Sequence, residues 1–388
     1  MTYNRPDCTL PDSILEAIAE QGWAFMPELL RIVLNAAMRS EREQHLGAAS
    51  YERSSERRGY ANGYKPKTVT TRLGNITFDV PQVRDGDFYP SALEKGVRSE
   101  RALKLALAEM YVQGVSTRKV AAITEQLCGV AISSSQVSRA VAELDPQLEA
   151  WRKRPLGSFR YVWFDARYEK VRVDGLVRDA AVLLAVGLNS DGKREVLGVS
   201  VSLSEAEVHW RTFMQSLVKR GLMNVELIVS DAHQGLQAAR QAVFGGILWQ
   251  RCQFHLQQNA QAYVPRTDLK TEVAADIRAI FNAPDRQAAD TLLAKTVAKY
   301  SQTASRLATW LEENIPQGLT VFSLPTTHRR RLRTTNGLER LNREIRRRSR
   351  VAALFPNEAS CLRLVTAIVM ETSEDWLTAR TYLRLDAV

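Results

Sequence analysis

Apolar residues recur every three or four positions along the first part of the chain, which is typical of amphipathic helices. The spacing predicts helices within residues 12–49, and such helices support either self-association or packing against their own chain. Residues 68–83 alternate β-branched and polar positions around Gly74-Asn75, which predicts a β-hairpin with its turn there. Residues 1–98 are therefore expected to be a helical and small β region for DNA binding or dimerisation.

The segment from residue 99 to residue 150 also has helical spacing. Two amphipathic helices are predicted, over about 117–127 and 134–144, and a serine caps the second. A helix-turn-helix accounts for this pattern, and so does a plain helical hairpin. In the first interpretation, the side chains available to a DNA groove are Ser134, Gln136 and Arg139.

After residue 155 the pattern changes to β-strands. Three strands joined by hairpins are followed by alternating helices and strands up to about residue 253, which predicts a mixed sheet with helices on its faces. No strand pattern appears over about 256–328, so that stretch is expected to be a helical insertion. The expected fold class is α/β, with residues 151–388 forming the sheet-containing domain.

The composition suits a globular protein, with 45% hydrophobic residues in a chain of 388. The four cysteines are scattered, which argues against a disulfide framework and for a reducing compartment. The longest apolar run, residues 180–188, is too short to cross a membrane and has the pattern of a buried strand. A cytoplasmic protein without a membrane partner is expected.

Positive charge is concentrated in one segment. Between Arg329 and Arg350, ten arginines against two acids leave a net charge of +8, while the whole chain carries +10. Clustered arginines bind phosphates through charge and counterion release, although a solvated basic face has the same composition. The arginines expected to contact DNA are Arg329, Arg330, Arg343, Arg346, Arg347 and Arg350.

Three acids occupy positions where a carboxylate is expected to need a cation or an ion-pair partner. Asp165 lies in the first predicted strand, Asp231 ends another, and Glu339 begins a helix inside the arginine segment. Each has an ordinary alternative: an ion pair of Asp165 with Arg167 or Lys170, helix capping by Asp231, and a capping box between Asn336 and Glu339. At 100° per residue, Leu338, Leu341 and Ile345 form an apolar stripe, and Glu339 lines up with Arg343, Arg346 and Arg350 on another face.

Five segments in this order carry a family resemblance: WFDARYEKVR, VSDAHQGL, WQRCQFHLQQN, TTNGLERLNREIRRR and LFPNEASCLRL. They are similar to the motifs of the IS256 or Mutator-type family of DDE transposases, and the resemblance covers most of the chain. It implies an RNase H-like catalytic core in residues 151–388, with the insertion between the second and third acids. It also implies that Asp165, Asp231 and Glu339 are the catalytic and metal-binding residues.

The resemblance further implies the chemistry and the partners. Three carboxylates suit two Mg²⁺ ions, with Mn²⁺ as a substitute, for in-line cleavage and transfer of phosphodiester bonds. The expected partners are the terminal inverted repeats of an insertion sequence, target DNA and a second protomer, and the expected location is the nucleoid. A DNA-binding regulator on a degenerate scaffold and an RNase H-like nuclease or resolvase are the alternatives.

Cys252 and His255 form a C-x-x-H pair that could be half of a zinc site. The sequence has no second pair at the usual spacing. A structural or DNA-contacting role near the acids is therefore the preferred interpretation.

Overall fold

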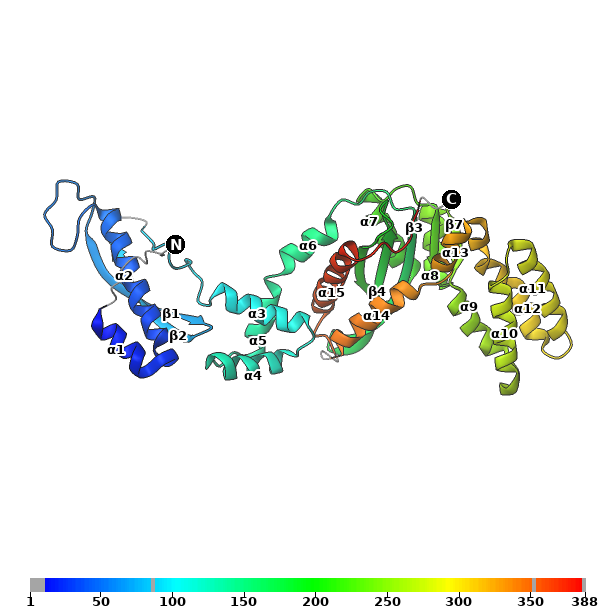
Figure 1. Ribbon diagram of the computed structural model, residues 1–388, viewed down its shortest axis with the longest axis horizontal. Helices are drawn as coiled ribbons and strands as arrows, with labels where there is room; N and C mark the ends of the chain where they lie inside the picture. Colours follow the sequence, from blue (N-terminus) through cyan, green and yellow to red (C-terminus); the bar gives the residue numbers. More distant parts are fainter. Residues whose placement is uncertain (1–10, 85–87, 351–353, 386–388) are drawn as a thin grey trace, which may run out of the picture. The chain divides into compact units, whose positions relative to one another are not determined.

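The computed structural model describes residues 11–84, 88–350 and 354–385, and the chain divides into two units, Met1–Glu143 and Leu144–Val388, described separately here (Figure 1). The expected boundaries of the domains lay at residues 98 and 150. None of the helices in the described ranges is long and apolar enough to cross a membrane.

A helix packed on a β-hairpin begins the first unit. Its elements are α1 (Asp12–Gln21), α2 (Met26–Leu46), β1 (Ala61–Thr71) and β2 (Gly74–Val83). Met38 of α2 is fully buried against Ile76, Phe78 and Val80, the inward-facing residues of β2. The strands pair antiparallel up to Thr71 and Gly74, so the turn is Arg72-Leu73.

The hairpin prediction was correct, but the turn precedes the expected Gly74-Asn75. The reason is local hydrogen bonding. Thr71 Oγ1 accepts from the Leu73 N–H at 3.1 Å and donates to the Gly74 carbonyl at 2.9 Å, which closes the turn two residues earlier than expected. Gly74 then begins β2 with a φ of 108°, a value that glycine adopts readily.

Three helices complete the first unit: α3 (Arg101–Val112), α4 (Thr117–Cys128) and α5 (Ser134–Ala142). Ser116 caps α4, and Gly129 ends it in the left-handed conformation. Ser133 and Gln136 form a capping box at the start of α5. Both helices predicted for this segment are thus present, and their buried residues include Val120, Val137 and Val141.

The second unit is built on a five-stranded mixed sheet in the order β5-β4-β3-β6-β7. Strands β3, β4 and β5 are antiparallel neighbours, whereas β6 runs parallel to β3 and β7 parallel to β6. The mixed sheet predicted from the sequence is confirmed. Its strands are β3 (Tyr161–Val173), β4 (Leu176–Leu188), β5 (Arg194–Ser202), β6 (Leu227–Ser230) and β7 (Leu248–Arg251).

Helices cover both faces of this sheet. On one face, Val162 and Phe164 of β3 pack with Trp210 of α7 (Glu207–Lys219) and Leu236 of α8 (Gln234–Phe244). Successive side chains of a strand point to opposite faces, so Trp163, Asp165 and Arg167 point to the other one. That face contacts α14 (Asn336–Ser349) and α15 (Glu358–Thr378), and α6 (Asp145–Lys153) packs against α15.

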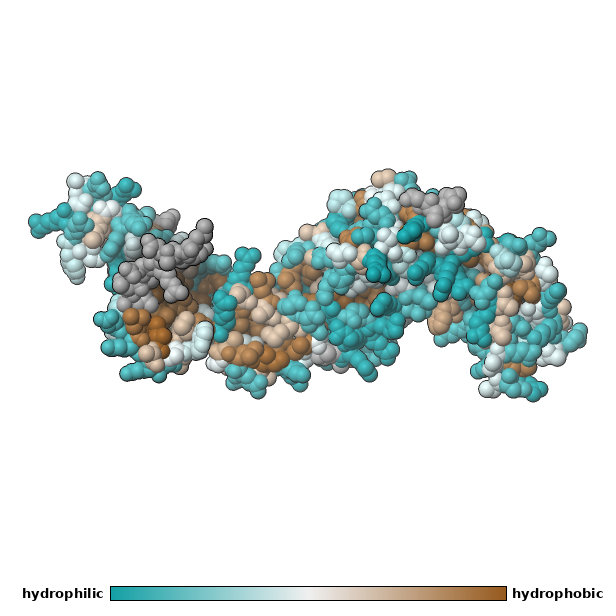
Figure 2. Space-filling view, in the orientation of Figure 1, coloured by the Kyte–Doolittle hydropathy of each residue, from teal (hydrophilic) through white to brown (hydrophobic). Residues whose placement is uncertain are grey.

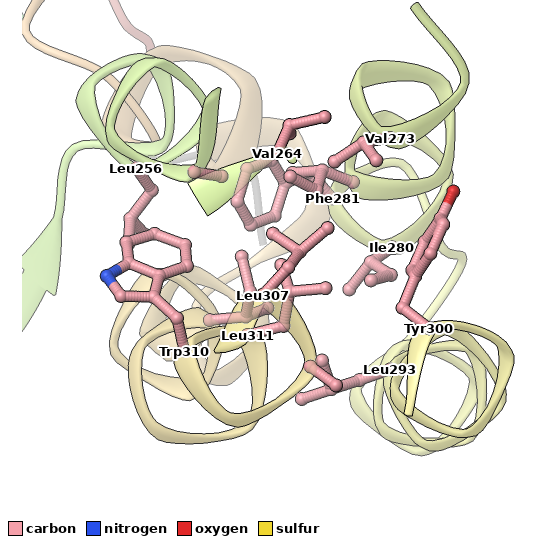
Figure 3. Packing of buried hydrophobic residues seen from close by; sticks show 14 of the residues in the cluster. Leu256, Val264, Val273, Ile280, Phe281, Leu293, Tyr300, Leu307, Trp310 and Leu311 are labelled. Atoms are coloured by element: carbon pink, nitrogen blue, oxygen red, sulfur yellow. The ribbon is translucent and has the colours of Figure 1, made fainter. Parts of the chain in front are cut away.

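The segment after β7 is helical, as the sequence indicated. It contains α9 (Gln253–Ala260), α10 (Lys270–Phe281), α11 (Arg286–Tyr300), α12 (Ser305–Asn314) and α13 (Thr326–Leu332). Figure 3 shows its own hydrophobic core, in which Ile280, Leu307 and Leu311 meet between the helices. The Gln253 N–H donates to the Arg333 carbonyl at 2.9 Å, so the chain leaves the sheet and returns at neighbouring points.

Candidate active site

Asp165 and Asp231 lie at neighbouring positions of two adjacent parallel strands. The pairing of β3 with β6 reaches Trp163 and Val229; Asp165 lies two residues further along β3, and Asp231 is the first residue after the end of β6. The pKa of Asp165 is raised to about 6, because burial, together with the negative charge of Asp231, outweighs the opposing effects of His255 and of the hydrogen bonds from Ala166 and Asn342. The sheet therefore brings two of the three predicted acids to one edge.

Glu339 is carried to this edge by α14. Leu338, Leu341 and Ile345 are almost fully buried, which confirms the predicted apolar stripe. One turn after Glu339, the Asn342 Nδ2 donates to the Asp165 Oδ2 at 2.7 Å. Residues three apart lie on the same helix face, so Glu339 shares its face of α14 with the residue that contacts Asp165.

None of the ordinary explanations for the three acids is realised. Arg167 pairs with Glu169, and Lys170 pairs with Asp179, so neither pairs with Asp165. The cap of α8 is His233, and the Asp231 Oδ1 accepts instead from the Ala232 N–H at 2.7 Å.

The capping box at Glu339 is absent as well. Helix α14 begins after Thr335 without a side-chain cap, and Glu339 Oε1 is buried without a hydrogen-bond partner among the described residues. Since a buried carboxylate oxygen without a partner is costly, this atom is suited to binding a ligand.

The Cys252 and His255 pair lies between the Asp231 strand and the Glu339 helix. Cys252 Sγ accepts from both the N–H and the Oγ1–H of Thr335, each at 3.4 Å, and the Cys252 N–H donates to the Ser230 carbonyl at 2.9 Å. His255 Nδ1 lies 4.0 Å from Asp231 Oδ2. The pair thus links the end of β6 to the start of α14.

The same pair carries shifted pKa values. Burial favours the neutral Cys252 thiol, yet the neighbouring His255 outweighs burial, so the pKa of Cys252 is lowered. The same pairing raises the pKa of His255 to about 9. Within the described ranges, the pair belongs to no group of three or more His, Cys, Asp or Glu residues that could hold a metal ion.

The predicted DNA-binding arginines fall into two groups. Arg330, Arg343, Arg346 and Arg350 are exposed and form no ion pair with any other described residue. The other two are engaged within the protein: Arg329 donates to the carbonyls of Leu324, Pro284 and Phe322, and Arg347 pairs with Glu344 at 2.7 Å. The surface over α14 is hydrophilic in Figure 2.

The candidate groove-reading residues belong to the first unit. Arg139 and Gln136 of α5 are exposed, and Ser134 is half-buried. Gln136 Oε1 already accepts from the Ser133 N–H at 2.7 Å in the capping box. Arg139 is therefore the residue of α5 whose polar atoms are most available to a partner.

The oxygen atoms at the site suit a hard cation. Within the described ranges no three His, Cys, Asp or Glu side chains lie close enough together to hold a metal ion. Glu339 Oε1 and Asn342 Oδ1 are nevertheless both buried without a hydrogen-bond partner among the described residues, one helical turn apart, and Asn342 contacts Asp165. Such carboxylate and amide oxygens are ligands that Mg²⁺ accepts.

Two residues of the site escaped the sequence analysis. Asn342 lies three residues after Glu339, a spacing that could have placed it beside the acids. In the sequence analysis this side of the helix was assigned to the arginine stripe instead, and Asn342 was not considered. Thr335 gave no signal, because its contact with Cys252 joins positions more than eighty residues apart.

The fold and the site define a mixed α/β protein in which partly buried acids lie at two neighbouring strands and on the adjacent helix, and arginines without an ion pair among the described residues lie along that helix. Comparison with known proteins identifies its family. The chain matches the model of the Mutator family of transposases over residues 12–379.

Curated relatives agree along nearly the whole length. The transposase for insertion sequence element IS406 of Burkholderia multivorans is 56% identical over 372 residues, covering 95% of this chain and 96% of that protein. The transposase for ISRM5 of Rhizobium meliloti is 46% identical, covering 92% and 90%. The transposase for IS256 in transposon Tn4001 of Staphylococcus aureus is 36% identical, covering 92% and 93%. The chain therefore belongs to the Mutator family of transposases.

Proposed function

We propose that this protein is the transposase of an insertion sequence, and that it cuts and joins DNA with Asp165, Asp231 and Glu339 on an RNase H-like core. The family and its curated relatives, which are named as insertion-sequence transposases, support the activity. The unpartnered buried Oε1 of Glu339 supports the choice of residues, because it is a ligand atom without a ligand.

In this proposal the three carboxylates would together hold two Mg²⁺ ions once DNA is bound, and Mn²⁺ would be able to substitute. Such ions, when bound, activate the attacking oxygen and stabilise the leaving oxygen of an in-line displacement. Asn342 orients Asp165 through its 2.7 Å hydrogen bond, and the Cys252–Thr335 contact fixes the start of α14. The exposed Arg330, Arg343, Arg346 and Arg350 contact DNA phosphates.

Two reactions follow on this site. In the first, a water oxygen attacks a phosphodiester at the end of the element, and the 3′ oxygen leaves as a hydroxyl. In the second, the oxygen of that 3′-OH attacks a phosphodiester of target DNA. A new P–O bond joins the element to the target strand, and the 3′ oxygen of the broken target bond leaves as a hydroxyl. The protein forms no covalent bond to DNA in either step.

Pairing two ends of an element requires at least two protomers, so we propose a homodimer or a larger assembly on DNA. The α1–α2 region is a candidate for the contact between protomers, since Trp23 there is 86% exposed. Helices α4 and α5 are proposed to read the terminal inverted repeats through Ser134, Gln136 and Arg139, and association with the nucleoid follows from DNA binding.

The test compares wild type with Glu339→Gln and, as a matched control, Glu344→Gln. Glu344 lies on the same helix but pairs with Arg347 and Arg348. Each purified protein is incubated with Mg²⁺ and a DNA fragment carrying the sequences that flank the gene. We expect nicking and end joining by wild type and by Glu344→Gln, and loss of both in Glu339→Gln with DNA binding retained. Binding without cleavage in all three proteins would favour a DNA-binding regulator.

A further inference from the structure

Arg194, at the start of β5, is held between two aromatic rings. Its guanidinium carbon lies 4.1 Å from the ring centroid of Trp376 and 4.5 Å from that of Tyr382. Tyr382 is fixed in turn, because its N–H donates to the Gly192 carbonyl at 2.9 Å. Planar stacking of this kind holds an arginine in one orientation while leaving its N–H donors free.

Two more arginines converge on this place. The guanidinium carbon of Arg331 lies 5.0 Å from the centroid of the same Tyr382 ring. Burial lowers the pKa of Arg194, and the positive charges of Arg340 and Arg331 lower it further. None of the three forms an ion pair with a carboxylate in the part of the chain that the structure describes.

This arrangement is unfavourable in the protein alone. Like charges brought together without a counter-charge repel one another, and here part of their hydration is also lost. A bound anion would remove both costs. An ordinary surface arginine would instead extend into the solvent or form an ion pair with a carboxylate. Arg348, which lies on α14 together with Arg340, is an example of such pairing, since it pairs with both Glu344 and Glu371.

The start of α14 lies beside the stacked arginine. A Cβ added to Gly337 would come within 3.0 Å of Arg194 Nη1, so the backbone of the first turn approaches the guanidinium closely. The first N–H groups of a helix have no partner within the helix and favour negative charge. Arg340 and Gly337 flank Glu339 along this turn, which places the basic cluster next to the candidate active site.

We propose that Arg194, Arg331 and Arg340 form a binding site for one phosphate of the DNA backbone, next to the position where Glu339 acts. This inference rests on the proposed function and adds a contact outside the stripe of Arg343, Arg346 and Arg350. Arg194 is the fixed part of the site, while the exposed Arg331 and Arg340 close on the phosphate. The site positions the strand for cleavage and takes no part in the chemistry.

The test measures how DNA affinity depends on salt. Full-length wild type, Arg331→Ala, Arg340→Ala and the double variant are titrated with a labelled duplex of mixed sequence between about 50 and 200 mM salt. Arg211→Ala is the matched control, since Arg211 is an exposed arginine of α7, on the opposite face of the sheet, and it pairs with Glu207. All substitutions are on the surface, and thermal unfolding verifies that each variant folds.

Each lost phosphate contact reduces the slope of log affinity against log salt by about 0.9. In the wild type, Arg331 and Arg340 contact the same phosphate, so losing either one loses that contact. We therefore expect each single variant, and the double variant, to lose about one unit of slope. Arg211→Ala should keep the wild-type slope. Wild-type binding with an unchanged slope in the double variant overturns this inference and leaves the proposed function standing. Absence of salt-dependent DNA binding by wild type would overturn both.

A second variant tests the stacking. Arg194→Lys keeps the positive charge but loses the planar group that lies between Trp376 and Tyr382. We expect weaker binding and slower strand cleavage at an almost unchanged salt slope, because the charge remains while its position is no longer fixed. Affinity and cleavage equal to wild type would show that the stacking has no part in the site.

Discussion

Asn342 donates a 2.7 Å hydrogen bond to Asp165 across the gap between α14 and β3, and its other amide atom, Oδ1, is buried without a partner. One side chain thus orients the most buried acid and keeps an acceptor available beside it. The contact also fixes the distance between the helix that carries Glu339 and the strand that carries Asp165.

Replacing Asn342 should therefore impair cleavage more than binding. Asn342→Ala removes the hydrogen bond that orients Asp165, and loss of such a supporting contact costs on the order of 10- to 100-fold in activity. Single-turnover cleavage with saturating DNA measures the effect. Gln258→Ala is a suitable control, because this exposed residue of α9 lies outside the contact. Equal cleavage rates for wild type and Asn342→Ala would refute the orienting role.

The carboxylate set predicts stabilisation by metal. If Asp165 is a ligand, Mg²⁺ at a hundredfold excess over its dissociation constant should raise the free energy of unfolding of wild type by about 2.7 kcal/mol. Asp165→Asn should show no such rise, while Asp179→Asn, an exposed residue paired with Lys170, should respond as wild type does. Thermal unfolding with and without Mg²⁺, in the presence of DNA, measures this without any cleavage assay. An equal response of Asp165→Asn would remove it from the ligand set.

Cys252 should matter through its sulfur atom. Cys252→Ala leaves the buried N–H and hydroxyl of Thr335 without an acceptor, and an unsatisfied buried donor costs about 1–3 kcal/mol. Cys361→Ala is the control, since Cys361 is equally buried but accepts no such pair of hydrogen bonds. Urea unfolding should show the larger loss for Cys252→Ala, and its cleavage rate should fall as well. Equal losses would mean that the thiol contributes only volume.

Neighbouring arginines on α14 should differ in their effect on DNA binding. Arg346 is exposed and unpaired among the described residues, whereas Arg347 already pairs with Glu344. Arg346→Ala should reduce the salt slope by about one unit, and Arg347→Ala should reduce it less. The same titration that tests the Arg331 and Arg340 site supplies the measurement. Identical slopes for the two variants would show that pairing with Glu344 does not decide which arginine binds.

Glu344 should make stability depend on pH. Its hydrogen bond with Arg347, followed by that with Arg348, lowers its pKa to about 2 from an ordinary 4.5. A lowered pKa gives stability that is fully present above pH 4.5 and is lost as the pH falls towards 2. Glu344→Gln should therefore lower the free energy of unfolding by about 1 kcal/mol near neutral pH, with the difference shrinking below pH 4.5. Urea unfolding at a series of pH values measures this. If the ion pairs were unimportant, the difference in free energy of unfolding between wild type and Glu344→Gln would stay constant with pH.

Periodic burial made most of the fold predictable. The three hairpin strands of the sheet and the alternating helices and strands after them occur in the predicted order, because each buries one face or both faces of a regular element. The predicted position of the β1–β2 turn was wrong, because the hydrogen bonds of the Thr71 side chain determine where the turn lies. Local patterns carry no information of that kind.

The site was predictable in part for a similar reason. Asp165 lies in a strand where a charge is unexpected, and Asp231 directly follows the end of another, so both could be recognised from the sequence. The contacts of Asn342 and Cys252 join distant segments, and only the folded chain brings them together. The aromatic support of Arg194 likewise depends on the return of the C-terminal segment to the Gly192 turn.

The hydrogen bond between Gln253 and Arg333 has a consequence for how this chain tolerates change in length. The insertion leaves and re-enters the sheet domain at adjacent points and has its own hydrophobic core (Figure 3). Closing a longer or shorter loop between fixed ends changes the free energy only slowly with length. The connections between these helices could therefore change in length without moving Asp231 or Glu339, which makes this segment a place where related proteins can diverge in size while the acids keep their positions.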